Sequence, residues 1–346
     1  MGWKSGALYQ EKKLKTMTRK INWILILQAW AMLWVVIGHA PLLSVDMIQP
    51  GYVEILYRIA YSFHMPLFIF VSGYLFYMTR INKPMPYAEM VLDKLKRLGI
   101  PFLFFTLVAM VVKTLFASDM ARPSTISVNE FIRSVMYPGQ GPLGELWFVA
   151  TIFWMFLLRP VWAWTLKNGY SSVCTLIVLL LIRLITPPRG IELLCISTAM
   201  RYAVFFYVGM CFRRFVNVQS LMSLKSGYML CGIVILVGVE LVLWHYSLAL
   251  LLAFTGITIS IAVALLFDRY IPKIFSLFRN YTYQIYLMGI FIQILVKMLY
   301  KRDIFPSYFW GYALCILCGL YIPVLIAYIA RKLDIEFIKL CLGLSK

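Results

Sequence analysis

The stretch from Ile21 to Leu43 reads INWILILQAWAMLWVVIGHAPLL and decides the fold class. It is long enough to cross a lipid bilayer as a helix, which takes about 20 mostly apolar residues. The rest of the chain has a similar composition, since 62% of its 346 residues are hydrophobic and 14% are charged. A typical soluble domain is about 45–50% apolar and about 25% charged. The sequence therefore predicts an all-α, polytopic transmembrane helix bundle.

About ten segments are expected to span the membrane, of which the fifth and sixth are short. They form one transmembrane domain over residues 21–330, preceded by a basic segment, 1–20, and followed by a tail, 331–346. The longest loop, about 117–145, is rich in turn residues, and no loop is long enough for a soluble domain. The expected spans are 21–43, 55–78, 100–116, 146–164, 172–186, 199–212, 227–244, 247–267, 280–299 and 308–330.

The distribution of basic residues predicts the orientation of the chain, because cytoplasmic loops of membrane proteins are enriched in Lys and Arg. The loop 44–54 contains no Lys or Arg, whereas the next loop, 79–99, contains five. Both termini are therefore expected on the cytoplasmic side. The same bias accounts for the formal net charge of +19, so no nucleic-acid partner is expected.

Polar residues on the first expected span lie on one face of the helix. Gln28 and His39 are eleven residues apart, which places them on one stripe about 16 Å apart along the axis. Ionisable groups inside a span are candidates for function, so the stripe indicates a lined cavity. The alternative is that His39 only caps the outer end of the helix before Pro41.

The second expected span carries a histidine beside a proline. Pro66 frees a backbone carbonyl one turn earlier, near Ser62, and His64 and this carbonyl could satisfy each other structurally. Arg58 is expected either to anchor the helix at the interface or to belong to the site. Ser72 allows a neighbouring helix to approach closely.

Three further polar or aromatic residues stand at the starts of later spans. Glu145 and Trp147 open the fourth span, and Arg201 lies at the start of the sixth. No metal site is expected, because Cys315 and Cys318 form a lone CxxC pair without a second pair of ligands. These cysteines are interpreted as packing residues.

Three stretches together resemble the acyltransferase-3 family of integral membrane O-acyltransferases: INWILILQAWAMLWVVIGHAP, FHMPLFIFVSGYLF and GELWFVATIFWMFLL. LKRLGIPFLFF and TYQIYLMG also resemble family elements, so the resemblance covers roughly residues 20–330. The first stretch is most similar to the branch of fucose 4-O-acetylase-like proteins. Three positions depart from the family pattern. Gln28 replaces a basic residue, Leu25 replaces a frequent acid, and Met288 stands where many relatives have a second histidine.

The resemblance implies transfer of an acyl group, most often acetyl, from acyl-CoA to a hydroxyl of a surface polysaccharide or its lipid-linked precursor. It implies a multi-pass protein of the bacterial inner membrane with acetyl-CoA as the donor substrate and no bound cofactor. His39 is expected to act as the general base or a transient acyl carrier, with His64 orienting it or polarising the thioester. The expected substrate-binding residues are Gln28, Arg58, Ser72, Glu145, Trp147 and Arg201.

Two other functions remain open from the sequence. A transporter or flippase that moves a lipid-linked sugar also has polar stripes inside a bundle. The neutral residue at Gln28 also fits a non-catalytic component of a polysaccharide-export system, because an amide offers only hydrogen bonds to a donor phosphate.

Overall fold

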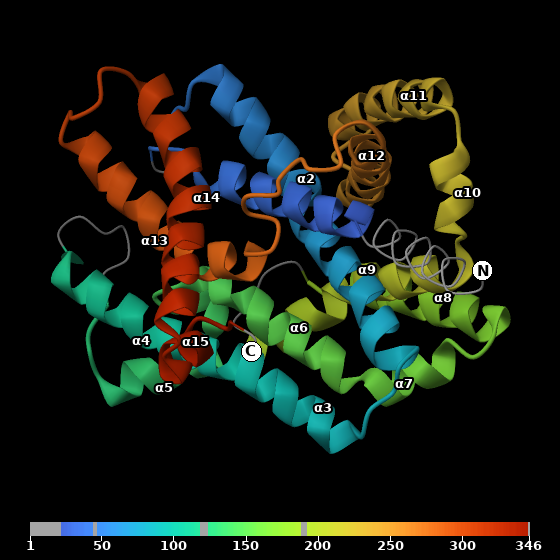
Figure 1. Cartoon of the computed structure of the whole chain (residues 1–346), viewed down its shortest axis with the longest axis horizontal. Helices are drawn as coiled ribbons and strands as arrows, with labels where there is room; N and C mark the ends of the chain where they lie inside the picture. The colour runs from blue at the N-terminus through green and yellow to red at the C-terminus, as the bar shows by residue number, and fades with distance from the viewer. Residues whose placement is uncertain (1–21, 44–46, 118–123, 188–191, 345–346) are drawn as a thin grey trace, which may run out of the picture. The chain divides into compact units, whose positions relative to one another are not determined.

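The computed structural model describes residues 22–43, 47–117, 124–187 and 192–344, and every regular element in these ranges is a helix (Figure 1). The expected basic segment 1–20 lies outside them. The chain divides into two compact units. The first unit comprises Met1–Phe68 and Asn217–Thr282, and the second comprises Ile69–Val216 and Tyr283–Lys346.

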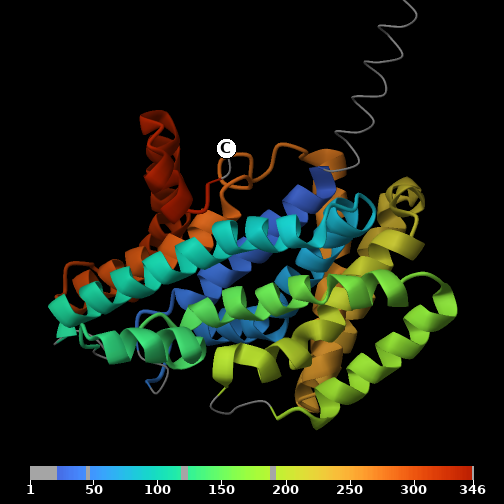
Figure 2. The ribbon, with the colours of Figure 1, turned by 90° about the horizontal axis from the view of Figure 1, so that it is seen from below.

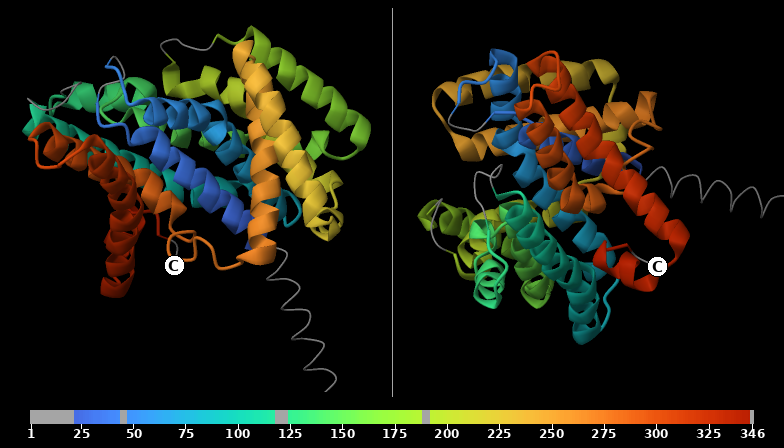
Figure 3. Two further views of the ribbon diagram at one scale, coloured as in Figure 1. Left: turned by 90° about the horizontal axis from the view of Figure 1, so that it is seen from above. Right: turned by 90° about the vertical axis from the view of Figure 1, so that its left-hand side faces the viewer.

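The first unit is built from the N-terminal helix, Asn22–His39, and the first part of α2, Gly51–Phe76, together with a helical hairpin. The hairpin consists of α11, Ser226–His245, and α12, Ala249–Tyr270, which lie side by side (Figure 3). A short helix, α10, Val218–Ser223, precedes them. Most of α11 is exposed and apolar, as expected for a helix surface in contact with lipid.

Packing in the first unit centres on aromatic side chains of the N-terminal helix. The Trp30 indole donates to the Ser260 hydroxyl across 3.2 Å, and its ring meets Phe267 edge-on at 6.0 Å. Gly256 of α12 faces Phe63, and a Cβ at this glycine would lie 2.5 Å from the Phe63 Cβ. These contacts fix the N-terminal helix and α2 against α12, and thereby place the two histidines that the helices carry.

The second unit contains the remaining helices. Figure 2 shows α3 and α4 as one long rod, because a π-helical turn, Leu95–Gly99, joins them without a break. α5 lies in the segment expected to be a loop, and Ser127 caps it by accepting a bond from the Glu130 N–H. The helices are α3 (Tyr87–Lys94), α4 (Ile100–Leu115), α5 (Val128–Met136), α6 (Trp147–Leu157), α7 (Arg159–Thr165), α8 (Gly169–Ile185), α9 (Ile196–Phe215), α13 (Thr282–Lys301), α14 (Tyr308–Leu333) and α15 (Glu336–Cys341).

Two glycines bring the backbones of α2 and α9 into direct contact inside the second unit. A Cβ at Gly73 would lie 2.0 Å from the Phe206 carbonyl oxygen, and a Cβ at Gly209 would lie 2.0 Å from the Phe70 carbonyl oxygen. No side chain fits in either place, so the small residues permit a close helix crossing of the kind common in membrane proteins.

Among the described residues, eight helices are long and apolar enough to cross a membrane, which confirms the all-helical, multi-pass class. They correspond to eight of the ten expected spans. The segment expected at 146–164 is a pair of helices bent by 55°, where Pro160 cannot donate a backbone bond, and the pair is a ninth candidate if it forms one broken span. The segment expected at 172–186 is α8, which has only 17 residues and carries Arg183 in its last turn.

Candidate functional site

The first unit brings His39 and His64 together with a tyrosine between them. His39 ends the N-terminal helix and His64 lies in α2, with the two ring centroids 6.5 Å apart. The Tyr61 ring lies edge-on to both, at 6.0 Å from His39 and 4.9 Å from His64. Tyr57 packs against Tyr61 with the ring centroids 4.2 Å apart and the ring planes tilted by 32°. Both expected catalytic residues therefore belong to one aromatic cluster, although their roles remain predictions.

His64 is held in one orientation by its own helix. Its side chain is 2% exposed, and its Nδ1 lies 2.5 Å from the Ala60 carbonyl oxygen. A carbonyl only accepts, so Nδ1 carries the proton in this bond and a neutral ring leaves Nε2 as an acceptor. The hydrogen-bond partner of His64 was expected to be the carbonyl near Ser62 that Pro66 frees, but it is the Ala60 carbonyl. The reason is distance along the helix, because Nδ1 reaches the carbonyl one turn before its own residue.

Gln28 has a neutral partner of its own. Its amide nitrogen donates to the Thr282 hydroxyl across 3.0 Å, and Thr282 is buried. This bond joins the N-terminal helix to Thr282, the last residue of the first unit. An amide and a hydroxyl need no counter-charge, so the neutral residue at this position is structurally satisfied. Its expected role toward a substrate is not decided by this contact.

Arg58 and Ser72 are two further expected site residues on α2. The Arg58 guanidinium is paired with Glu54 one turn earlier at 2.5 Å, and the two side chains are 66% and 49% exposed. Such an exposed pair contributes little to stability, and it fits the anchor interpretation of Arg58. Ser72 is half-buried in the part of α2 that belongs to the second unit, next to the Gly73 crossing.

In the second unit, Glu145 and Trp147 lie where a short 3₁₀ turn, Gly144–Leu146, leads into α6. The Trp147 ring packs against Tyr202 of α9, with the ring centroids 5.4 Å apart. The Tyr286 hydroxyl of α13 donates to the backbone carbonyl of Glu145, which fixes this turn from another helix. The turn therefore presents Trp147 to the start of α9, beside Arg201.

Arg201 lies next to a second arginine that the sequence analysis did not single out. The Arg183 Nη1 donates to the Arg201 backbone carbonyl at 3.0 Å, and the Arg201 Nη1 donates to the Thr186 carbonyl at 2.9 Å. Arg183 is 9% exposed and its guanidinium lies over the Phe205 ring at 4.9 Å. One signal was available in the sequence, a charged residue inside an apolar helix, which merits attention in any spanning segment.

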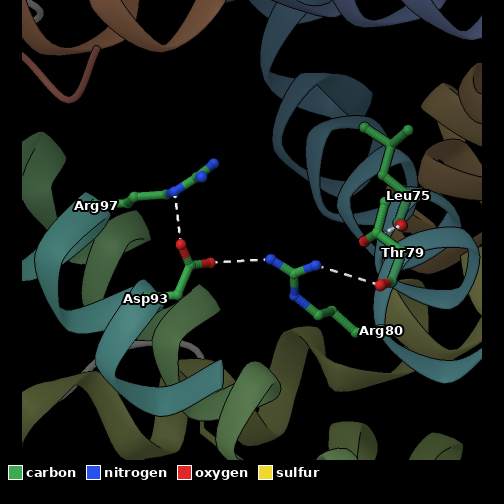
Figure 4. Close-up of polar contacts among 5 residues, drawn as sticks. All are labelled: Leu75, Thr79, Arg80, Asp93 and Arg97. Carbon is green, nitrogen blue, oxygen red and sulfur yellow. Dashed lines mark hydrogen bonds and ion pairs between the residues drawn. The ribbon is translucent and has the colours of Figure 1, made fainter. Parts of the chain in front are cut away.

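A third polar group lies where α2 ends and α3 leads into α4, in the basic loop 79–99 that is expected on the cytoplasmic side. Figure 4 shows Asp93 between two arginines. Its two carboxylate oxygens bind Arg80 at 2.9 Å and Arg97 at 2.8 Å. The Lys94 ammonium lies 4.4 Å from the centre of the Phe156 ring. Since one carboxylate is shared by two guanidiniums, the group keeps a net positive charge suited to an anionic ligand.

No group of three or more His, Cys, Asp or Glu side chains could hold a metal ion among the residues that the structure describes. The polar groups described above supply imidazole, guanidinium and aromatic rings. Imidazole moves protons near neutral pH, and guanidinium groups bind phosphates and carboxylates.

The apolar helices define a multi-pass membrane protein. Residues 21–328 match the model of the acyltransferase-3 family, described as an acyltransferase domain, and the chain belongs to this family. Comparison with curated proteins and with solved structures gave no match. The family and the eight candidate spans together establish a multi-pass membrane acyltransferase.

Proposed function

We propose that the protein is a membrane O-acyltransferase of the bacterial inner membrane, in the fucose 4-O-acetylase-like branch of its family. It transfers an acyl group, in the first place acetyl, from acyl-CoA to a hydroxyl of a surface polysaccharide or its lipid-linked precursor. The observation that carries the proposal is the histidine pair at 6.5 Å, with the His64 proton committed to the Ala60 carbonyl.

His39 is the proposed general base. A sugar hydroxyl is a weak nucleophile at neutral pH and needs a positioned base. His39 accepts the hydroxyl proton while the oxygen attacks the thioester carbonyl. The new carbon–oxygen bond forms, the carbon–sulfur bond breaks, and the proton passes from His39 to the sulfur of CoA. His64 orients the reacting groups, since its Nδ1 is held and its Nε2 faces away from that bond.

The donor phosphates are assigned to the group around Asp93. Acyl-CoA is a cytoplasmic polyanion, and the segment 79–99 carries the charge that predicts the cytoplasmic side. Arg80 and Arg97 are aligned by one carboxylate and retain other guanidinium N–H groups for phosphate oxygens. This group supplies a positive charge that Gln28 lacks. Both termini are then cytoplasmic and His39 lies toward the outer side, so either the donor threads inward to His39 or its acetyl group is relayed outward.

The test is acyl transfer by the purified protein. Protein in nanodiscs is incubated with acetyl-CoA labelled in the acetyl group and with surface polysaccharide from a strain lacking this protein. Label in the polysaccharide supports the proposal, and succinyl-CoA as the alternative donor identifies the acyl group. Absence of label with both donors, from protein that still binds CoA, contradicts it.

The rival functions give different results in the same preparation. A flippase moves a lipid-linked sugar across the bilayer of a proteoliposome without acyl-CoA. A non-catalytic component of an export system gives neither label nor movement, although its deletion changes the surface polysaccharide. The Gln28–Thr282 bond is the observation that keeps this last function open, because both groups are already paired.

A further inference from the structure

Arg183 and Arg201 form a reciprocal pair between α8 and α9 in the second unit. Each guanidinium donates to a backbone carbonyl next to the other arginine, Arg183 to that of residue 201 and Arg201 to that of Thr186. The two positive charges are therefore held close together in a largely apolar helical hairpin. Each of these bonds uses one of the five N–H donors that a guanidinium carries.

No carboxylate in the described part of the chain bonds to either arginine. The nearest acid along the chain, Glu192, is already occupied, because its carboxylate accepts from the Thr198 N–H and the Ser197 hydroxyl at the start of α9. Arginine does not lose its proton in proteins. Two adjacent cations inside an apolar hairpin are costly without an anion, so the pair lacks the counter-charge that Asp93 gives to Arg80 and Arg97.

Capping of helix ends accounts for only part of this arrangement. A cation near the last turn of α8 interacts favourably with the helix dipole. One such cation is enough for that purpose, and Arg183 already supplies it. The second guanidinium, which comes from the neighbouring helix, bonds the C-cap carbonyl of α8 at Thr186, but this one bond leaves its charge without an anion.

An aromatic surface adjoins the two cations. Tyr202 lies 5.7 Å from the Arg183 guanidinium on one side and 5.4 Å from the Trp147 ring on the other. Trp147, Tyr202 and Arg201 are each partly exposed, whereas Arg183 is buried. Aromatic rings offer an apolar face for the C–H groups of a sugar, and paired guanidiniums bind phosphate through parallel hydrogen bonds.

We propose that this cluster is a binding site for a sugar phosphate, with Arg183 and Arg201 on the phosphate and Trp147 and Tyr202 on the sugar. The inference rests on the proposed function in one respect, since it names the acceptor as a phosphorylated sugar. The phosphate belongs either to a lipid-linked sugar or to a nucleotide sugar, and both share the chemistry that the cluster recognises.

Binding is measured first without acyl-CoA, so that the result does not depend on catalysis. Purified protein in a nonionic detergent without phosphate or sugar groups is heated with one of four probes. These are polyprenyl diphosphate glucose, UDP-glucose, free glucose and inorganic phosphate. We expect the first probe to raise the melting temperature most, and free glucose to have no effect. A larger shift with UDP-glucose identifies the nucleotide sugar as the source.

Two substitutions distinguish a loss of ligand binding from a loss of folding. Arg201→Lys keeps one charge but loses the fork that binds two oxygens, and we expect roughly tenfold weaker binding of the best probe. Trp147→Leu leaves the cations in place, so binding of the sugar phosphate weakens while binding of inorganic phosphate does not. Arg214→Gln is the matched control, because Arg214 lies at the other end of α9 and also donates to a backbone carbonyl, that of Lys167.

The inference fails if Arg201→Lys and Trp147→Leu bind the probes like the unsubstituted protein, or if free glucose stabilises as well as its phosphate. Acyl transfer distinguishes this failure from that of the proposed function. If acyl transfer to an unphosphorylated glycan is unaffected by both substitutions, the sugar-phosphate site is rejected and the acyltransferase function is retained. If both substitutions weaken probe binding but the protein transfers no acyl group, the sugar-phosphate site is retained and the acyltransferase function is rejected.

Discussion

The two units each place a pair of basic side chains against aromatic rings, but the pairs differ in charge. His39 and His64 meet around Tyr61 in the first unit, and Arg183 and Arg201 meet beside Tyr202 in the second. Imidazole is neutral in one of its two forms near neutral pH. Guanidinium is always charged. The histidine pair can therefore remain in an apolar setting without a ligand, whereas the arginine pair needs a counter-ion there.

This difference separates chemistry from binding. A group that exchanges a proton without a large electrostatic cost is suited to general acid–base catalysis. A group with a permanent charge is suited to holding an anion in place. Substitutions in the first unit should therefore act mainly on the rate of transfer, and those at the arginines mainly on affinity.

The largest expected effect comes from His39→Ala. Loss of a positioned general base lowers the rate by about 10²–10⁴-fold, while the protein still inserts and accumulates in the membrane. The measurement is transfer of labelled acetyl groups to polysaccharide at saturating acetyl-CoA. His245→Ala is the control, because this third histidine is exposed at the end of α11. Transfer at the normal rate by the His39 variant would remove this residue from the mechanism.

The next largest effect is on the stability of the fold, where glycine-to-alanine substitutions in the two units can be compared. In the second unit a Cβ at Gly209 meets a backbone carbonyl at 2.0 Å, whereas in the first a Cβ at Gly38 meets the Tyr61 ring at 3.2 Å. A ring can move by a few tenths of an ångström, but a packed helix backbone cannot. We expect Gly209→Ala to cost about 1–3 kcal/mol through overpacking, and Gly38→Ala less.

Gly232→Ala serves as the control for both glycine substitutions. It lies on α11 with nothing within 4 Å of an added Cβ, so the better helix propensity of Ala leaves stability unchanged or raises it by about 1 kcal/mol. The measurement is the thermal unfolding temperature of the three variants in one detergent. Equal melting temperatures for Gly209→Ala and Gly232→Ala would show that α2 and α9 do not cross as closely as described.

A smaller effect is expected from Arg97→Gln in the group around Asp93. The substitution removes one guanidinium and leaves Asp93 paired with Arg80. We expect the KM for acetyl-CoA to rise about tenfold with little change in kcat, because a contact to donor phosphates is made equally in the ground and transition states. Lys273→Gln, an exposed basic position in the first unit, controls for the lost charge. A lower kcat at unchanged KM would contradict the assignment.

The sequence predicted the positions of the helices better than the side-chain contacts between them. Hydropathy identified eight spans because apolar length alone decides whether a helix can cross a bilayer. It did not reveal the bend before Pro160, where the backbone breaks inside an apolar run. The helix α5 was missed although Ser127 and Glu130 form the spacing of a capping box, because turn residues on both sides dominated the composition.

Side-chain partners depend on which helices meet, and one sequence does not show this. The stripe through Gln28 and His39 followed from helix geometry, but the Thr282 partner of Gln28 lies 254 positions away in the chain. Tyr61 was missed because a tyrosine in an apolar span is indistinguishable in sequence from a packing residue. Arg183 was also missed, because its charge was the only signal in the sequence and its relation to Arg201 required the α8–α9 hairpin.

The smallest effect is expected from Gln28→Arg. This substitution adds a permanently charged guanidinium to the first unit, like those of the arginine pair in the second unit. If this position contacts the acyl donor, as the family resemblance implies, the substitution raises donor affinity by a few fold. The measurement is the shift in melting temperature caused by CoA. Gln28→Leu is the companion variant, since it also breaks the bond to Thr282 but adds no charge. An identical CoA-dependent shift in both variants would show that the donor does not reach Gln28, and the group around Asp93 would then carry donor recognition alone.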